Sequence, residues 1–175
     1  MKKDTTKLNK GFTLVESLVA IAILLVAVVG PMSVIGGSLS QISTARDQAI
    51  AINLAQEGIE IARQRRDSNM LNAWGGGGAV WSDGLAAGTY IVSSVIGTPL
   101  MLCSVGCTMG QKPVRQDAAG WYYQGAGGTP TKFIRTVTIS DSSPGEKRIS
   151  SDVTWEVGGT TKTVQVQELI LGINS

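Results

Sequence analysis

The feature that most constrains this chain is an apolar run near its start. The 24 residues from Phe12 to Ile35 include one charged side chain, Glu16. An α-helix rises about 1.5 Å per residue, so such a run reaches roughly 36 Å, which is enough to cross the hydrocarbon core of a membrane. The sequence therefore predicts a membrane-spanning helix over residues 12–35.

The segment before this run is basic. Residues 1–11 carry four lysines against Asp4, a net charge of +3. Because the whole chain carries +2, residues 12–175 carry −1. A basic flank predicts that the N-terminus stays in the cytoplasm and that the rest is exported. Since the net positive charge is confined to the leader, a nucleic-acid partner is compatible with the chain but is not indicated.

The position of a cleavage site separates this chain from an ordinary secretory precursor. No small-residue cleavage site ends the apolar run, which closes at Gly30-Pro31. The candidate break lies instead before the run, between Gly11 and Phe12. Cleavage there removes the basic leader and leaves the apolar helix on the mature protein.

The residues around this break resemble the class III signal of type IV prepilins and pseudopilins. The resemblance rests on the basic leader and on Lys10-Gly11-Phe12-Thr13-Leu14-Val15-Glu16. It implies that a prepilin peptidase cuts between Gly11 and Phe12 and methylates the new amino group of Phe12. It also implies a role in assembly for Glu16, the fifth residue of the mature chain. Beyond residue 35 the resemblance is one of architecture only.

An uncleaved signal anchor is the alternative for this segment. Thr13 and Glu16 would then form only a capping box at the start of a helix. That interpretation must accept a carboxylate in a membrane helix, which costs about 2.5–3.5 kcal/mol at its centre and less near the interface. The prepilin interpretation accounts for Gly11, Phe12 and the basic leader together, and we adopt it.

The helix is expected to continue as a stem over residues 36–68. Gly30-Pro31 and Gly36-Gly37 predict a kink or local melting, after which the helix resumes from Ser38 to Arg66. One polar stripe is expected on it, at Arg46, Asn53, Glu57, Glu60 and Gln64. The remaining surface is apolar, about two thirds of the whole, where an ordinary amphipathic helix has about a third.

Such a broad apolar surface predicts two kinds of partner for the stem, its own globular domain and other helices. The alternative is a core helix that one domain covers on both sides. Arg63, Arg65 and Arg66 suit a helix C-terminus, where cations oppose the macrodipole.

The exported body, residues 69–175, is expected to hold an antiparallel sheet. Strands are predicted over 89–95, 133–139, 149–157 and 162–171. Turn signals at 141–145 and at Gly158-Gly159 separate the last three. A meander with one apolar face needs a cover, which the stem supplies. The predicted fold class is therefore α+β, with a long N-terminal helix packed on a C-terminal antiparallel sheet, as in pilins.

Two loop regions interrupt the body. The glycine-rich segment 73–88 lacks the Lys-Ser/Thr and the strand–turn–helix context of a phosphate-binding loop. The second region, 97–132, holds the aromatic residues 121–123. These aromatic residues suit stacking on sugars or bases, or the more ordinary filling of a core or a subunit contact.

Composition argues against an enzyme. The chain has no histidine, which removes the commonest general base and every histidine-ligated metal site. We expect no catalytic residue, no metal and no cofactor. The two cysteines, Cys103 and Cys107, are expected to form a disulfide on the oxidising exported side, with free thiols as the alternative.

These observations predict a structural subunit of a type IV pilus or a type II secretion-like filament, a minor pilin or pseudopilin rather than the major subunit. The expected partners are other pilin subunits, the prepilin peptidase/methyltransferase, the assembly platform in the cytoplasmic membrane and membrane lipid. The expected location is that membrane, single-pass with the N-terminus inside, and an extracellular filament after assembly. The alternatives are a signal-anchored binding module or enzyme, and a tip subunit that binds DNA or a surface ligand.

Overall fold

The structure, a computed structural model, describes residues 11–93, 100–103 and 113–172, with the backbone alone at 33–37, 39 and 40. It divides into two compact units, Met1–Ala45 and Arg46–Ser175. The described part contains one helix, α1 (Leu14–Trp74), and seven strands. The fold class is α+β with an antiparallel sheet, as the sequence predicts.

Helix α1 is longer and more regular than expected. The α-helical backbone runs through Pro31 and the Gly36-Gly37 pair without a break, so the predicted melting is wrong. A proline removes one backbone donor, and the neighbouring turns retain their own hydrogen bonds.

The end of α1 also differs from the prediction. The helix extends past Arg66 to Trp74, so Arg63, Arg65 and Arg66 are not in its last turn. Gly76 ends it with a φ of 83°, and the Gly76 amide donates to the Ala73 carbonyl at 3.1 Å. A left-handed residue of this kind favours glycine and is a common helix stop.

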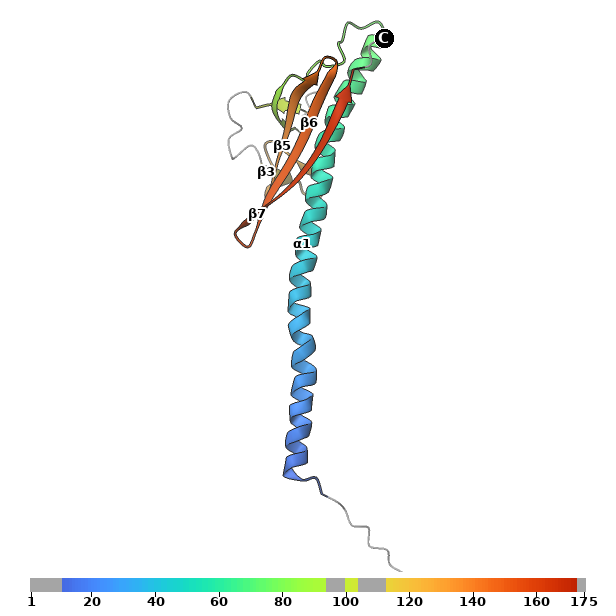
Figure 1. The fold of residues 1–175 in the computed structure, drawn as a ribbon. Helices are drawn as coiled ribbons and strands as arrows, with labels where there is room; N and C mark the ends of the chain where they lie inside the picture. The colour runs from blue at the N-terminus through green and yellow to red at the C-terminus, as the bar shows by residue number, and fades with distance from the viewer. Residues whose placement is uncertain (1–10, 94–99, 104–112, 173–175) are drawn as a thin grey trace, which may run out of the picture. The chain divides into compact units, whose positions relative to one another are not determined.

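The four predicted strands are present. They are β1 (Gly88–Val92), β5 (Thr129–Ser143), β6 (Glu146–Val157) and β7 (Thr160–Leu171). Strand β5 pairs antiparallel with β6 on one edge and with β1 on the other, and β7 pairs with β6. Figure 1 shows β5, β6 and β7 side by side. The hairpin turns fall at Pro144-Gly145 and Gly158-Gly159, where all three glycines have positive φ.

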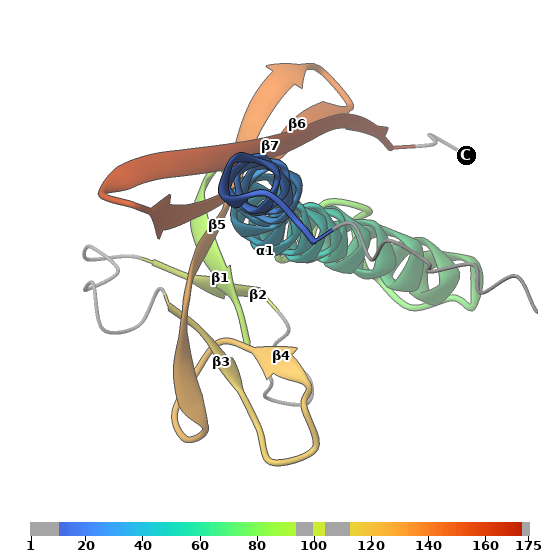
Figure 2. The same cartoon turned by 90° about the horizontal axis from the view of Figure 1, so that it is seen from below.

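Three short strands lie in the region 97–132 that we expected to be loop. They are β2 (Leu100–Leu102), β3 (Pro113–Gln116) and β4 (Tyr122–Tyr123). Strand β2 pairs with β1, β3 with β5, and β4 with β3 (Figure 2). Strands of two to four residues are too short to show an alternating pattern in the sequence. They form because they pair with strands that are distant in the sequence or with each other.

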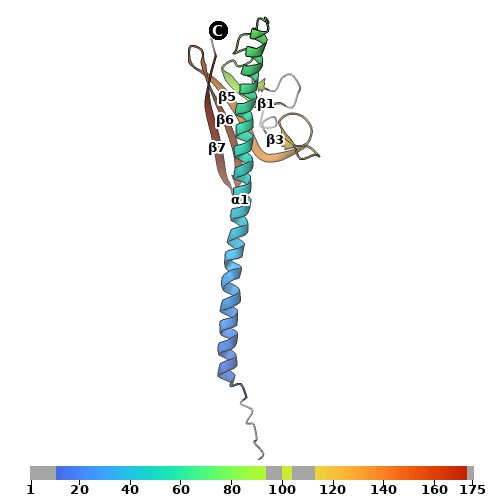
Figure 3. The same cartoon turned by 90° about the vertical axis from the view of Figure 1, so that its right-hand side faces the viewer.

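Within the second unit, one face of α1 covers the sheet (Figure 3). Its buried apolar residues follow helical spacing, at Ala51, Leu54, Ala55, Ile59 and Ala62. Ile59 and Ala62 pack with Val137, Ile139, Ile149 and Ile170, and Ala51, Leu54 and Ala55 pack with Val114, Phe133, Val153 and Trp155. The stem thus contacts its own domain, and its contact with other helices stays a prediction.

Candidate processing and assembly site

The segment around the predicted break precedes the helix. Gly11, Phe12 and Thr13 are non-helical and exposed. Gly11 has no positive φ, and a Cβ built on it meets no atom within 4 Å. The described residues therefore set no steric requirement for glycine at this position.

Thr13 caps α1. Its Oγ1 accepts a hydrogen bond from the Glu16 amide at 3.2 Å, and its carbonyl accepts one from the Ser17 amide at 3.1 Å. This is the threonine half of the capping box that the signal-anchor alternative describes. A cap and a processing signal can share these residues, so the bond does not favour the uncleaved anchor.

Glu16 lies in the first turn of α1 with its side chain exposed. It is the only charged residue between Gly11 and Met32. The helix N-terminus carries partial positive charge, which stabilises a carboxylate there. A full counter-charge for Glu16 must come from outside this stretch.

The apolar side chains of this helix segment are exposed. Leu14–Met32 is long and apolar enough to cross a membrane, and none of it is buried. Phe12, just before it, is 75% exposed. A continuous exposed apolar surface of this size requires lipid or other apolar helices around it. This supports membrane anchoring of the chain.

The predicted disulfide is described at one end only. Cys103 follows β2, its amide donates to the Thr89 carbonyl at 2.8 Å, and the residue is disulfide-bonded. Cys107 lies outside the described residues, and the pairing of the two stays a prediction.

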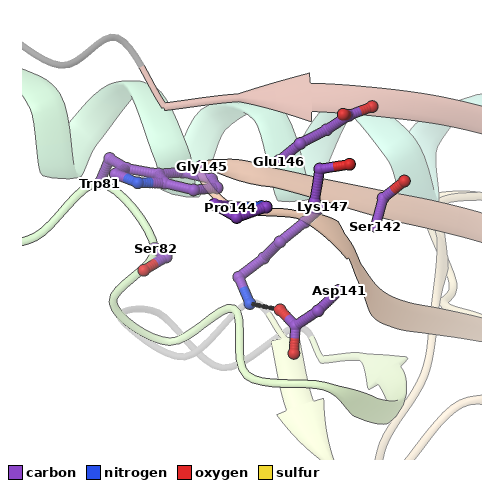
Figure 4. Close-up of a pocket in the computed structure, with 9 residues that line it drawn as sticks. Trp81, Ser82, Asp141, Ser142, Pro144, Gly145, Glu146 and Lys147 are labelled. Atoms are coloured by element: carbon purple, nitrogen blue, oxygen red, sulfur yellow. Dashed lines mark hydrogen bonds and ion pairs between the residues drawn. The ribbon is translucent and has the colours of Figure 1, made fainter.

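One cavity opens beside the β5–β6 turn. It has a volume of about 420 Å³ and is lined by Trp81, Ser82 and residues 141–147. Figure 4 shows Trp81 beside Pro144 and Gly145, and Lys147 paired with Asp141 at 2.5 Å. A Cβ at Gly172 would come within 2.2 Å of Trp81 Nε1. Trp81, from the glycine-rich segment, therefore lies against Gly172 as well as lining the cavity.

The aromatic residues of the second loop region lie on both sides of the start of β4. Trp121 precedes it and is 74% exposed, whereas Tyr122 and Tyr123 form the strand and are half-buried. Two cavities adjoin them, of about 300 and 510 Å³. The core-filling interpretation therefore fits the tyrosines better than Trp121.

A buried polar network under α1 escaped the sequence analysis. Arg135 is fully buried, and its Nη1 donates to Glu57 Oε2 at 2.5 Å and to the Leu54 carbonyl at 3.1 Å. Its Nε donates to Gln124 Oε1 at 3.0 Å. Burial lowers the pKa of the Arg135 guanidinium, and the charge of Glu57 opposes that shift.

A signal for this network was present in the sequence. Phe133, Val137 and Ile139 are buried on alternate positions of β5, and Arg135 occupies the position between Phe133 and Val137 on the same face. An arginine at an inward position of an alternating strand needs a buried partner, and the acidic residues of the covering helix can supply one.

No group of three or more potential metal ligands occurs among the described residues.

The comparisons with known proteins concern the N-terminal end of the chain. Residues 6–30 match the family model of the prokaryotic N-terminal methylation motif. No curated protein and no solved structure matches the chain. The match covers the second half of the basic leader, the Gly11–Phe12 bond, the Thr13 cap and Glu16, and the chain thus carries the class III signal of type IV pilins and pseudopilins.

Proposed function

We propose that this protein is a structural subunit of a type IV pilus or a type II secretion-like filament, a minor pilin or pseudopilin. The observation that carries the proposal is the methylation motif at residues 6–30, placed directly before an exposed apolar helix. A folded α+β domain follows this helix, and the proposed subunit acts by assembly rather than by catalysis.

Processing is the first step of the proposed mechanism. A prepilin peptidase cuts the exposed Gly11–Phe12 bond and methylates the Phe12 amino group. Residues 1–11 leave as the basic leader, 12–35 remain as the membrane and filament-core helix, 36–68 act as the stem, and 69–175 form the exported domain. The helix holds the subunit in the cytoplasmic membrane, with its N-terminus inside, until the assembly platform extracts it.

Assembly is the second step. Extraction from lipid exposes the apolar surface of residues 12–32, and bundling with the helices of other subunits covers it again. Glu16 is the one charge in this apolar segment. A buried charge of this kind persists only with a partner, and the new Phe12 amine of a neighbouring subunit is the cation that processing creates.

The N-terminus of the protein purified from cells tests this function. We expect a mature chain that begins with N-methylated Phe12, and we expect the protein in sheared surface filaments or in a pseudopilus fraction. Replacement of Gly11 by a bulky residue should leave the leader attached. A membrane protein that still starts at Met1, or that is cut after residue 30, contradicts the proposal and favours a signal-anchored module.

A further inference from the structure

Two cavities of the second unit meet at an exposed tryptophan. The first, about 300 Å³, is lined by Ile50, Asn53, Leu54, Glu57, Trp121 and Tyr122. The second, about 510 Å³, shares Glu57, Trp121 and Tyr122 with it and adds, among others, Asp117 and Tyr123. Because three residues line both, the two cavities adjoin each other beside α1 and β4. We call them together the tryptophan groove, defined by Asn53, Glu57, Asp117, Trp121, Tyr122 and Tyr123.

A tight turn holds Trp121 in place. Asp117 Oδ1 accepts hydrogen bonds from the Ala119 amide at 2.9 Å and the Trp121 amide at 2.8 Å. The Asp117 amide donates to the Trp121 carbonyl at 3.1 Å. The indole is nevertheless 74% exposed. The fold thus fixes the backbone of a large aromatic residue and leaves its ring in water, an arrangement that favours contact with a ligand over core packing.

Both carboxylates of the groove already have hydrogen-bond partners within the domain. Glu57 accepts from the buried Arg135 at 2.5 Å. Asp117 accepts two backbone hydrogen bonds from its own turn. Among the residues that the structure describes, no lysine or arginine lines either cavity. The two carboxylates of the described groove wall, Glu57 and Asp117, disfavour a phosphate chain, and the pairing of Glu57 with the buried Arg135 beneath the wall weakens the attraction of a cationic ligand.

The groove therefore offers an aromatic face and several hydrogen-bond acceptors, and its two carboxylates already have partners within the domain. A ligand that suits this surface has an apolar ring face and many hydroxyl donors. We propose that the tryptophan groove binds a neutral saccharide. Trp121 stacks on the face of one sugar ring, the Asn53 amide donates to or accepts from its hydroxyl groups, and the Glu57 carboxylate accepts hydrogen bonds from them. This activity does not depend on the proposed role in a filament.

Binding is tested on the full chain, purified in a detergent that has no sugar head group. The probes are the neutral disaccharides maltose, cellobiose, lactose and diacetylchitobiose, measured by saturation-transfer NMR. We expect saturable binding of at least one of them, with an affinity that changes by less than about twofold between low and high salt, since a neutral ligand is not screened. Absence of binding by all four at millimolar concentration overturns the proposal.

Matched tryptophan variants locate the site. Trp121→Ala should lower the affinity about tenfold, the size of a typical aromatic contact. Trp74→Ala removes a tryptophan that is 67% exposed at the end of α1 and outside the groove, and it should bind as the wild type does. Both side chains are on the surface, so both variants should fold.

A second variant and a competition complete the test. Asn53→Ala, on the exposed side of α1, should also weaken binding. Equal affinities of the Trp121→Ala and Trp74→Ala variants contradict the assignment. Displacement of the sugar by a lysine-rich peptide or a single-stranded oligonucleotide, with steep salt dependence, would replace the saccharide with a charged macromolecule as the ligand.

Discussion

Glu57 on α1 and Arg135 on β5 form an ion pair of 2.5 Å that joins the helix to the sheet. The two partners differ in exposure, because the Arg135 side chain is completely buried whereas that of Glu57 is 43% exposed. Arg135 Nη2 has no hydrogen-bond partner among the described residues. The guanidinium therefore depends on Glu57, Gln124 and the Leu54 carbonyl for its compensation.

The first prediction concerns loss of this pair. Glu57→Ala leaves a buried cation without its counter-charge, and we expect the free energy of unfolding to fall by about 1–3 kcal/mol. Water can reach the vacated position because Glu57 is partly exposed, which keeps the loss below that of a fully buried pair. Urea denaturation of the full chain in detergent measures it.

A matched control is available one turn along the same helix. Glu60 pairs with Arg63 at 3.1 Å, and both side chains are largely exposed. Exposed pairs contribute little, so Glu60→Ala should leave the urea midpoint nearly unchanged. If the two variants lose the same free energy of unfolding, the burial of Arg135 does not make the loss of its counter-charge costlier.

The second prediction concerns Gly58, where α1 approaches the sheet closely. A Cβ at this position would lie 2.4 Å from Ser151 Oγ and 3.0 Å from Val137 Cγ2. Alanine is a better helix former than glycine by about 1 kcal/mol. We nevertheless expect Gly58→Ala to destabilise the domain by about 1–3 kcal/mol, because both neighbours belong to the packed sheet.

A second substitution tests whether contact with Ser151 causes the loss of stability in Gly58→Ala. Ser151→Gly removes both serine atoms that the new Cβ would meet, so the double variant should recover part of the stability lost by Gly58→Ala. Gly30→Ala is the control, because Gly30 is also helical and its Cβ would meet nothing within 4 Å. Strict additivity of the Gly58 and Ser151 changes in thermal melts would refute the proposed contact.

The sequence predicts the long helix and the four longer strands because each carries its own signal. The 24-residue apolar run, the alternation in residues 133–139 and the Gly158-Gly159 turn are local patterns. The regions that it missed depend on partners far along the chain. Strand β3 exists through pairing with β5, and Arg135 is compensated by Glu57, 78 residues away. The helix through Pro31 shows the opposite case, in which a local breaker is outweighed by the turns around it.

The candidate sites also divide into one that a local sequence pattern predicts and one that depends on distant segments. Gly11, Phe12 and Glu16 belong to one continuous motif, which the family comparison recovers at residues 6–30. The tryptophan groove joins Asn53 and Glu57 of the stem to residues 117–123, and no local pattern indicates that these segments meet.

The third prediction concerns alkaline stability. Burial raises the pKa of the Tyr90 hydroxyl above its usual value of about 10. The hydroxyl also donates to the Ala86 carbonyl at 2.7 Å. A raised folded-state pKa means that this contribution to stability is fully present below about pH 10 and is lost as the pH rises through the folded-state pKa.

Tyr90→Phe should therefore be less stable than the wild type at pH 8, by about 1 kcal/mol for the lost hydrogen bond. The difference between the two proteins should shrink as the pH rises above 10. Urea midpoints measured across this range decide the matter, and a constant difference would show that Tyr90 ionisation does not affect folding.

The fourth prediction concerns the disulfide of Cys103. The chain has two cysteines, and we expect Cys103 to pair with Cys107. Three residues separate them, so the closed loop is short and the bond should contribute no more than about 2 kcal/mol. Peptide mapping without reductant should recover the linked fragments. Two alkylated thiols in the untreated protein, or a covalent dimer, would contradict this pairing.

The last prediction concerns Glu16, on which the proposed assembly mechanism depends. Its carboxylate is the one charge between Gly11 and Met32, and the nearest basic residue in the sequence, Lys10, leaves with the leader. In a growing filament the Phe12 amine of the incoming subunit can meet Glu16 of the subunit already docked. Such a pair neutralises a costly charge and sets the axial register.

The expected result is asymmetric. Glu16→Val should leave export, folding and cleavage after Gly11 intact, because the Gly11–Phe12 bond and the Thr13 cap are unchanged. It should lower incorporation, measured by immunoblot of sheared filaments against the membrane fraction. Ser17→Ala, which removes a neighbouring polar group that contacts only the Thr13 carbonyl in the described chain, is the control and should incorporate normally. If Glu16→Val incorporates as well as the wild type, the pairing mechanism is wrong for this subunit. The subunit would then be one that starts or caps a filament and needs no subunit ahead of it.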